Sequence, residues 1–330
     1  MRPADESALR ETSPGCRCLL SRSIVLKATC MKTNNKPRRR AVSATNRRRW
    51  LQAGAAAVCA ALPRIAGAQD EYKVTQGRIQ QSVIHWCFRP MPVGDLATHA
   101  ARMGLKSVEL VGPEHWPTLK KHGLMCAISG SHGFAKGFAH VEEHSECVDK
   151  LRQSIDATAA EGWPSVITFS GFRRGISDED GVRNMVEGLK KIVGHAERKK
   201  VTLCLEMLNS KVNVEMKGHP DYFCDNIERC VEICKQVGSE RLKILFDIYH
   251  VQIMEGDLIA RIRKFHPFIG HYHTAGNPGR NEIDDTQEIH YPPIMKAIVE
   301  TGYKGYVGQE FIPLRDKVAS LNQAVKICDV

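Results

Sequence analysis

From residue 79 onward, the chain alternates between short apolar runs rich in β-branched residues and longer stretches with an apolar residue every three or four positions. The first pattern is typical of buried strands and the second of amphipathic helices. The predicted strands cover residues 79–88, 106–112, 124–132, 165–171, 201–208, 242–250, 268–276 and 305–313. The predicted helices cover residues 92–103, 114–122, 140–161, 177–199, 220–237, 256–265, 291–301 and 315–328.

Local signals at the ends of these segments support the assignment. Ser177 precedes three acidic residues, a composition that caps a helix and suits its positive N-terminus. Glycines such as Gly104 and Gly238 stand where predicted helices end. Eight strand–helix units in about 260 residues predict an α/β fold, a (β/α)8 TIM barrel that forms a single domain over 79–330. A doubly wound open sheet is the alternative, but no G-x-G-x-x-G or P-loop motif follows a predicted strand, so no nucleotide cofactor is expected.

Residues 1–68 have the features of a leader. The stretch "NRRRWLQ" (46–52) precedes the small apolar run "AGAAAVCAALPRIAGA", which ends in an A-x-A cleavage signature at Ala68. Consecutive arginines, a bulky aromatic residue and leucine before a mildly apolar run are similar to a twin-arginine export signal. Met31 would begin a signal peptide of conventional length.

The leader also bears on the location of the protein. Its apolar run contains Pro63 and Arg64 and is short for ~30 Å of hydrocarbon, so no stable membrane anchor is expected. The sequence therefore predicts the twin-arginine export machinery as a partner and a periplasmic location. Residues 69–78 are expected to be a linker between the leader and the barrel.

Charge and cysteine content narrow the function classes. The whole chain has a formal net charge of +10, but residues 1–68 hold 14 Lys and Arg against 3 Asp and Glu. Residues 69–330 hold 33 and 34, a net charge of −1, so no nucleic-acid partner is expected. The eight cysteines of this part include no CxxC pair, which argues against a zinc ribbon or a thioredoxin-type site.

Four consecutive predicted strands each end in a side chain that can bind a metal. Glu206, Asp247, His273 and Glu310 lie late in strands five to eight, among apolar residues, and we call them the tetrad. TIM barrels place their chemistry at these strand ends. Each residue alone has an ordinary alternative as a helix cap, a surface charge or a hydrogen-bonded side chain. Together, three carboxylates in one barrel mouth would repel one another without a cation, so the set predicts a divalent metal.

The donor types indicate which metal is expected. Three carboxylates and one imidazole suit Mg²⁺ or Mn²⁺ better than structural zinc, which prefers Cys and His ligands. Co²⁺ and Zn²⁺ stay open as alternatives.

The segments around the tetrad resemble a known family. The stretches "LCLEMLNS", "LFDIYHVQIMEGD", "GHYHTAGNPGRNEID" and "GYVGQEFIP" are similar, in order and spacing, to the hydroxypyruvate isomerase family over about residues 79–320. That family belongs to the xylose-isomerase-like barrels, which include the tagatose and psicose 3-epimerases. The resemblance implies one divalent metal on the tetrad and a catalytic acid–base pair formed by Glu206 and Glu310.

Two positions depart from the family pattern. His273 stands where hydroxypyruvate isomerases carry glutamine and the 3-epimerases carry histidine. Met207 stands where a proline is expected after the first glutamate. The general chemistry tolerates both changes, but they leave the exact substrate open.

These observations predict an isomerase that interconverts a hydroxy-keto acid and its aldehyde isomer, of the hydroxypyruvate/tartronate semialdehyde type. The metal would acidify the C–H beside a carbonyl and stabilise the enediolate. One glutamate would remove the proton and the other would return it.

Two residues outside the tetrad are expected to contact the substrate. His250 follows Asp247 by three positions and is expected to hydrogen-bond the oxygen that gains charge, with loop stabilisation as the alternative. Arg280 closes the "AGNPGR" turn and is expected to clamp a carboxylate. A salt bridge from Arg280 to Glu282 or Asp284 is the alternative.

Two further residues are expected near the site. Glu109 ends the second predicted strand and is included among the substrate-binding residues because it is placed to orient the site. His271 shares a face with His273 but lies about 6–7 Å deeper along the strand, so it is expected to support the metal ligands without binding the metal.

Three other functions fit parts of the sequence. A ketose 3-epimerase would share the metal and the glutamates but needs a longer pocket. An endonuclease IV-like nuclease needs several zinc ions and a basic DNA-binding face, which a net charge of −1 does not supply. A non-catalytic sugar- or metal-binding protein would bind its ligand without proton exchange. The expected partner is a small hydroxy-carbonyl substrate, and a homodimer is considered because barrels of this type often dimerise.

Overall fold

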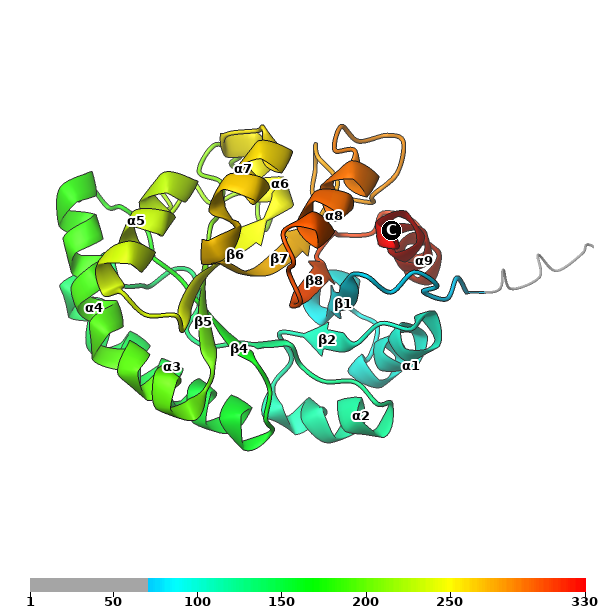
Figure 1. Ribbon diagram of the computed structural model, residues 1–330, viewed down its shortest axis with the longest axis horizontal. Helices are drawn as coiled ribbons and strands as arrows, with labels where there is room; N and C mark the ends of the chain where they lie inside the picture. The colour runs from blue at the N-terminus through cyan, green and yellow to red at the C-terminus, as the bar shows by residue number, and fades with distance from the viewer. Residues whose placement is uncertain (1–70) are drawn as a thin grey trace, which may run out of the picture. The chain divides into compact units, whose positions relative to one another are not determined.

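The computed structural model describes residues 71–330; the predicted leader, its cleavage site and the first two linker residues lie outside the described residues. Eight parallel strands form a nearly closed barrel with helices around it, which confirms the predicted TIM barrel (Figure 1). The strands are β1 (Gln80–Ile84), β2 (Ser107–Glu109), β3 (Ile128–Ser129), β4 (Ser165–Thr168), β5 (Thr202–Glu206), β6 (Leu242–Asp247), β7 (Ile269–Thr274) and β8 (Tyr306–Gln309). The α-helices are α1 (Val93–Met103), α2 (Trp116–Lys121), α3 (His144–Ala160), α4 (Asp178–Lys199), α5 (Ile227–Val237), α6 (Ile248–Met254), α7 (Leu258–Phe265), α8 (Tyr291–Glu300) and α9 (Lys317–Cys328).

The barrel closes between β2 and β3 by a few backbone hydrogen bonds. The paired strands run in the order β2-β1-β8-β7-β6-β5-β4-β3. Across the remaining seam, the Val108 amide donates to the Met125 carbonyl at 3.1 Å, and the Leu110 amide donates to the Ile128 carbonyl at 3.1 Å. All eight strands therefore point their C-terminal ends to the same end of the barrel.

Helix capping sets several element boundaries. Ser177 accepts a hydrogen bond from the Asp180 amide and caps α4, as the sequence predicted. The Asp247 side chain accepts from the Tyr249 and His250 amides and starts α6, so the predicted continuation of this strand to residue 250 was wrong. Asn226 caps α5, so that helix begins seven residues later than predicted.

The third predicted strand is much shorter than expected. Residues 124–132 were predicted as one strand, but β3 covers only Ile128–Ser129. The Ser107 hydroxyl, instead of a carbonyl, accepts from the Ala127 amide at 2.8 Å, which interrupts the regular ladder beside β2.

Part of the predicted linker is described by the structure. Residues 71–78 contain no helix, and the Asp329 carboxylate accepts the backbone amides of Thr75 at 2.6 Å and Gly77 at 3.0 Å. The segment is thus tied to the end of α9. The boundary at residue 79 stays a prediction.

The cysteines of the described part are all buried free thiols: Cys87, Cys126, Cys147, Cys204, Cys224, Cys230, Cys234 and Cys328. Burial raises the pKa of Cys126, Cys204 and Cys328 to about 12. No helix within residues 71–330 has the length and apolar character needed to cross a membrane.

Candidate active site

The barrel brings the four tetrad residues together at the C-terminal ends of four adjacent strands. Glu206 and Asp247 are the last residues of β5 and β6, and His273 pairs in register with Asp247 across β6 and β7. Glu310 follows β8 directly, and its amide donates to the Thr274 carbonyl at 2.9 Å. All four side chains are buried, with at most 5% of the residue exposed. Four separate strand ends thus converge on one point.

The donor atoms of the tetrad are close enough to share one cation. One ligand atom from each residue lies within 4.8 Å of the others. His273 Nδ1 lies 2.8 Å from Glu310 Oε2 and 3.9 Å from Glu206 Oε1. Three carboxylates and an imidazole in this arrangement fit a divalent ion such as Mg²⁺ or Mn²⁺. The role of the four residues as ligands stays a prediction that this geometry supports.

The pKa values of the three carboxyl groups of the tetrad are shifted in different directions. Burial, followed by repulsion from Glu310, raises the pKa of Glu206 to about 8. Burial also raises the pKa of Asp247 to about 6, although Arg280 opposes the shift. Burial alone would raise the pKa of Glu310, but Arg280 and His273 outweigh it and hold that pKa well below its usual range.

The predicted Arg280 side chain turns inward to the tetrad. Its guanidinium donates to Glu310 Oε2 at 2.6 Å and to Asp247 Oδ2 at 3.4 Å, and it is 2% exposed. The alternative partners are engaged elsewhere: Glu282 accepts the Leu314 amide, and Asp284 accepts from the side chain of Thr286, at 2.8 and 2.6 Å. The salt bridges that the sequence offered as an alternative are therefore not formed.

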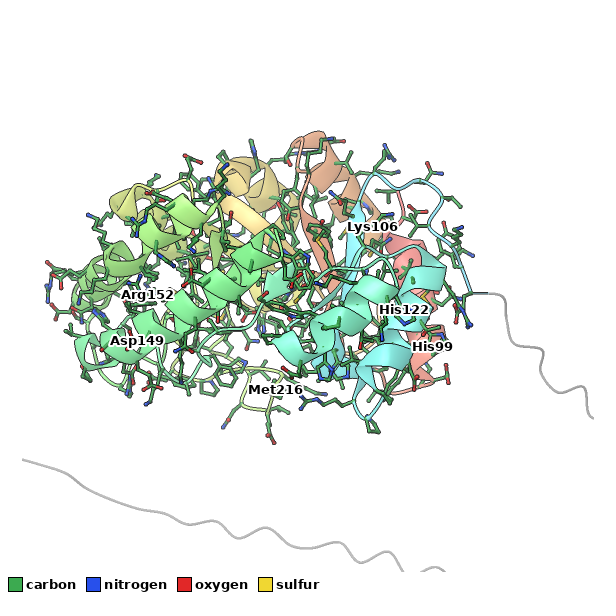
Figure 2. The ribbon with its side chains drawn as sticks, turned by 90° about the horizontal axis from the view of Figure 1, so that it is seen from below. His99, Lys106, His122, Asp149, Arg152 and Met216 are labelled. Carbon is green, nitrogen blue, oxygen red and sulfur yellow. The ribbon has the colours of Figure 1, made fainter. Side chains whose placement is uncertain are left out.

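The loop between β5 and α5 covers this arginine. The Met216 carbonyl accepts from the Arg280 guanidinium at 2.7 Å. Figure 2 shows Met216 in this loop and Lys106, which immediately precedes β2, toward opposite edges of the molecule. The two residues mark the C-terminal and N-terminal ends of the barrel. The loop thus forms part of the roof over the tetrad.

His250 lies in the first turn of α6, whereas the sequence placed it at the end of the predicted strand. Its Nδ1 accepts the Asn209 backbone amide at 3.0 Å, which assigns the proton of the neutral ring to Nε2. Nε2 is buried, has no hydrogen-bond partner among the described residues, and lies 3.7 Å from Asp247 Oδ2. Burial and the positive charge of Arg280 hold the pKa of His250 well below its ordinary value. The ring therefore presents an unused N–H donor beside the tetrad.

Glu109 lies beneath the tetrad, inside the barrel. Its Oε2 accepts from His271 Nε2 at 3.0 Å and from His273 Nε2 at 3.2 Å, while Oε1 accepts from the Ser82 hydroxyl. Burial would raise the pKa of Glu109, but the two histidines lower it to about 2. His271 is 1% exposed and lies below the tetrad, as the sequence predicted, where it donates to Glu109. The substrate contact predicted for Glu109 stays a prediction.

Two neighbours of the tetrad lie outside the set of predicted site residues. Trp86 Nε1 donates to Glu310 Oε1 at 3.1 Å, and the Arg280 guanidinium lies 5.2 Å from the Trp86 ring. The His219 ring lies 6.0 Å from that of His250 and 4.4 Å from that of Phe134. Trp86 stands near the end of a predicted strand, and this position indicates a residue that lines the pocket. His219 sits in a loop without periodicity and gives no comparable signal.

Comparison with known proteins places this geometry in a family. The family model described as "Xylose isomerase-like TIM barrel" matches residues 98–326. The 2-oxo-tetronate isomerase of Cupriavidus necator is 34% identical over 136 residues, 41% of this chain and 50% of that protein. The hydroxypyruvate isomerase of Escherichia coli is 31% identical over 147 residues, 44% of this chain and 54% of that protein. The chain thus spans about half the length of these two curated relatives, both of which are isomerases.

A solved structure supports the same fold. The AP endonuclease, family 2, from Brucella melitensis superposes with a TM-score of 0.64 over 74% of this chain and 97% of that one, at 23% identity. An identity this low shows the fold alone. The family match covers most of the barrel, and with it the four strands that carry the tetrad. The chain belongs to the xylose isomerase-like TIM barrel family.

Proposed function

We propose that this protein is a divalent-metal-dependent isomerase that interconverts a small hydroxy-keto acid and its aldehyde isomer, of the hydroxypyruvate/tartronate semialdehyde type. The observation that carries the proposal is the tetrad, four buried metal-competent side chains whose donor atoms lie within 4.8 Å of one another at the C-terminal end of the barrel. The names of the two curated relatives, a hydroxypyruvate isomerase and a 2-oxo-tetronate isomerase, support the reaction class.

The tetrad would hold the metal, with Mg²⁺ or Mn²⁺ preferred for its oxygen-rich donor set. When bound, such an ion supplies Lewis acidity to a carbonyl and a hydroxyl oxygen of the substrate. Glu206 and Glu310 are the proposed acid–base pair. One takes the proton from the carbon beside the carbonyl, and the other returns it to the neighbouring carbon.

The residues around the tetrad would bind and orient the substrate. The free Nε2–H of His250 is placed to donate to the substrate oxygen that gains charge. Arg280 carries a buried Nε without a partner among the described residues, and its guanidinium can pair with a substrate carboxylate. The burial of the tetrad excludes water, which protects an enediolate from side reactions.

Proton exchange in D₂O tests the proposal. The purified protein is stripped with a chelator, reconstituted with Mn²⁺ or Mg²⁺, and incubated with hydroxypyruvate while NMR follows the C–H signals. We expect deuterium incorporation and a shifted carbonyl only in the reconstituted protein, and loss of both in Glu206→Gln. A protein that binds no divalent metal after reconstitution, or a Glu206→Gln variant that exchanges at the wild-type rate, would overturn the proposal.

A ketose 3-epimerase is the second candidate, and His273 is the observation that favours it. The sequence carries histidine at the strand-seven position, as the 3-epimerases do. The same NMR experiment with D-fructose or D-tagatose separates the two functions. Inversion at C3 with the carbonyl unmoved would identify an epimerase, whereas a moved carbonyl would identify an isomerase.

We also propose that the protein is exported by the twin-arginine machinery to the periplasm. The support is the sequence "NRRRWLQ" and the apolar run that follows it. Replacing Arg47 and Arg48 by lysine should leave the protein in the cytoplasmic fraction. A periplasmic fraction unchanged by this double substitution would exclude the twin-arginine route.

A further inference from the structure

The two ring nitrogens of His273 face two different carboxylates. Nδ1 points to the tetrad and lies 2.8 Å from Glu310 Oε2. Nε2 points the other way and lies 3.2 Å from Glu109 Oε2. Both His273 and Glu109 are fully buried, so no water competes for either contact. A metal on the tetrad would therefore take Nδ1, and the proton of the neutral ring would stay on Nε2.

Glu109 is itself held in place from two directions. The Ser82 hydroxyl on β1 donates to its Oε1, and His271 Nε2 on β7 donates to its Oε2 at 3.0 Å. Glu109 belongs to β2, so its carboxylate links three strands of the barrel interior. A carboxylate fixed in this way has a defined position for the one remaining donor, His273 Nε2.

Gly308 on β8 leaves the space that this contact needs. In the strand register, Gly308 pairs with Ser82 on one side and with His273 on the other. A Cβ at Gly308 would lie 2.9 Å from Glu109 Oε2, 3.0 Å from His273 Cδ2 and 2.6 Å from Ile84 Cδ1. Gly308 is not among the residues with a positive φ, so backbone conformation does not require glycine here. The absence of a side chain at Gly308 thus leaves room for Ile84 and for the contact between Glu109 and His273.

We infer that Glu109 is a positioning residue, held in place by His271 and Ser82. It contacts His273 Nε2 in the space left by Gly308, keeps the proton of the ring on Nε2, and so directs the Nδ1 lone pair to the metal. The inference rests on the proposed metal site of the tetrad. A carboxylate behind a metal-bound histidine fixes the tautomer and the orientation of the ring and raises its basicity. Removal of such a partner typically weakens metal binding by about 10- to 100-fold.

The test compares metal affinity in wild type and Glu109→Gln. Mn²⁺ binding is measured by calorimetry on chelator-stripped protein, and we expect a dissociation constant about 10- to 100-fold higher in the variant. Glu143→Gln is the matched control. Glu143 is also a buried glutamate, 7% exposed, but it accepts from the Gly137 amide and pairs with Arg174, and it is not among the donors grouped with the tetrad. The control should bind Mn²⁺ as wild type does.

A spectroscopic readout separates positioning from a general loss of structure. In Mg²⁺-loaded protein with ¹⁵N-labelled histidine, the His273 signals should show a protonated Nε2 and an unprotonated Nδ1. In Glu109→Gln, the Nε2 signal should shift because its carboxylate acceptor is gone, while the spectrum of His144, which lies outside this cluster, should not change. Wild-type protein with the proton on Nδ1 of His273 would overturn the inference.

Gly308→Ala tests the same contact while Glu109 stays in place, and it serves if Glu109→Gln does not fold. The added methyl group should push Glu109 and His273 apart and weaken Mn²⁺ binding at least several-fold. Wild-type affinity in both folded variants would overturn the inference while the proposed function stands. A wild-type protein that binds no Mn²⁺ would overturn the proposed function and this inference with it.

Discussion

Glu109 and Glu206 are two buried glutamates of one barrel interior that lie on opposite sides of the His273 ring, yet their pKa values are shifted in opposite directions. Glu109 accepts hydrogen bonds from Ser82, His271 and His273, and its pKa falls to about 2. Glu206 has no side-chain hydrogen-bond donor among the described residues, its nearest positive group is His273 Nδ1 at 3.9 Å, and its pKa rises to about 8. Protein side chains therefore satisfy the carboxylate of Glu109, whereas the carboxylate of Glu206 is available to a bound ligand.

The largest expected effect is the loss of activity when Glu206 is replaced. Glu206→Gln removes a proposed ligand and a proposed acid or base, so proton exchange should fall at least ~10³-fold. The metal-free variant should be as stable as wild type or slightly more stable, because an amide replaces a buried carboxylate that lacks donors. The exchange rate in D₂O and urea unfolding in a chelator give the two quantities. A large loss of metal-free stability would show that Glu206 is a structural residue.

Glu109→Gln should show the opposite stability effect. The substitution takes a charged acceptor from three buried donors, so the free energy of unfolding of the metal-free protein should fall by about 2–4 kcal/mol. Urea unfolding in a chelator measures it, with the exposed Glu179→Gln as a control expected to change stability little. If Glu109→Gln and Glu206→Gln destabilise the protein equally, the distinction between the two glutamates fails.

Metal addition should stabilise wild type more than Glu206→Gln. A divalent ion at 100 times its dissociation constant should raise the free energy of unfolding of wild type by about 2.7 kcal/mol, because it binds only the folded state. Glu206→Gln should lose most of this gain at the same Mn²⁺ concentration. Thermal or urea unfolding with and without Mn²⁺ measures the difference. A gain that persists in Glu206→Gln would place the ion elsewhere.

Glu255 is a partly buried glutamate whose surroundings are intermediate between those of Glu109 and Glu206. It accepts from the Asn226 side chain and the Ile227 amide and lies 3.5 Å from Arg261, but it also faces Glu228. Burial raises its pKa to about 7, although Arg261 opposes the shift. The folded state therefore binds this proton more tightly than the unfolded state, whose glutamates titrate near ~4.3.

The sign of the resulting pH effect follows from linkage. A raised folded-state pKa makes the unfolding free energy fall as pH rises from about 4.5 to about 7, with no further change from this group above that range. Glu228 has a lowered pKa and titrates below this range, so it does not offset the loss. Solvent screening of the partly exposed Glu255 reduces its effect, and we expect a net loss on the order of 1–2 kcal/mol. The difference between wild type and Glu255→Gln at pH 5 and pH 8 measures it. A difference of zero, or one of opposite sign, would contradict the prediction.

Periodicity and strand-end chemistry were enough to predict the barrel and the tetrad. The alternation of strand and helix patterns is repeated eight times. The rule that chemistry sits at C-terminal strand ends, applied to metal-competent side chains among apolar residues, points to the four residues of the tetrad. The boundaries were weaker, because Asp247 acts both as a strand end and as the cap of α6, and the sequence pattern shows only the first role.

The remaining site residues depend on contacts that no sequence pattern encodes. Arg280 could be placed in a turn, but its pairing with Glu310 instead of Glu282 depends on how that turn folds over β8. His219 and Met216 reach the site from an irregular loop, which carries no periodic signal. The position of Glu109 on β2 was predictable. Its contact with His273 on β7 requires the register of four strands, β2, β1, β8 and β7, and the absence of a side chain at Gly308.

The eight buried thiols of the barrel have a practical consequence. Thiol reagents attack the thiolate, and each of these cysteines is both shielded from solvent and unpaired in the native barrel. The folded protein should therefore be inert to alkylation, and any labelling should report transient opening of the segment that carries the modified residue. Cys204 on β5 and Cys328 at the end of α9 would report the opening of two different parts of the same domain. Their labelling rates, read by mass spectrometry, would show whether the strands below the tetrad open separately from the C-terminal helix.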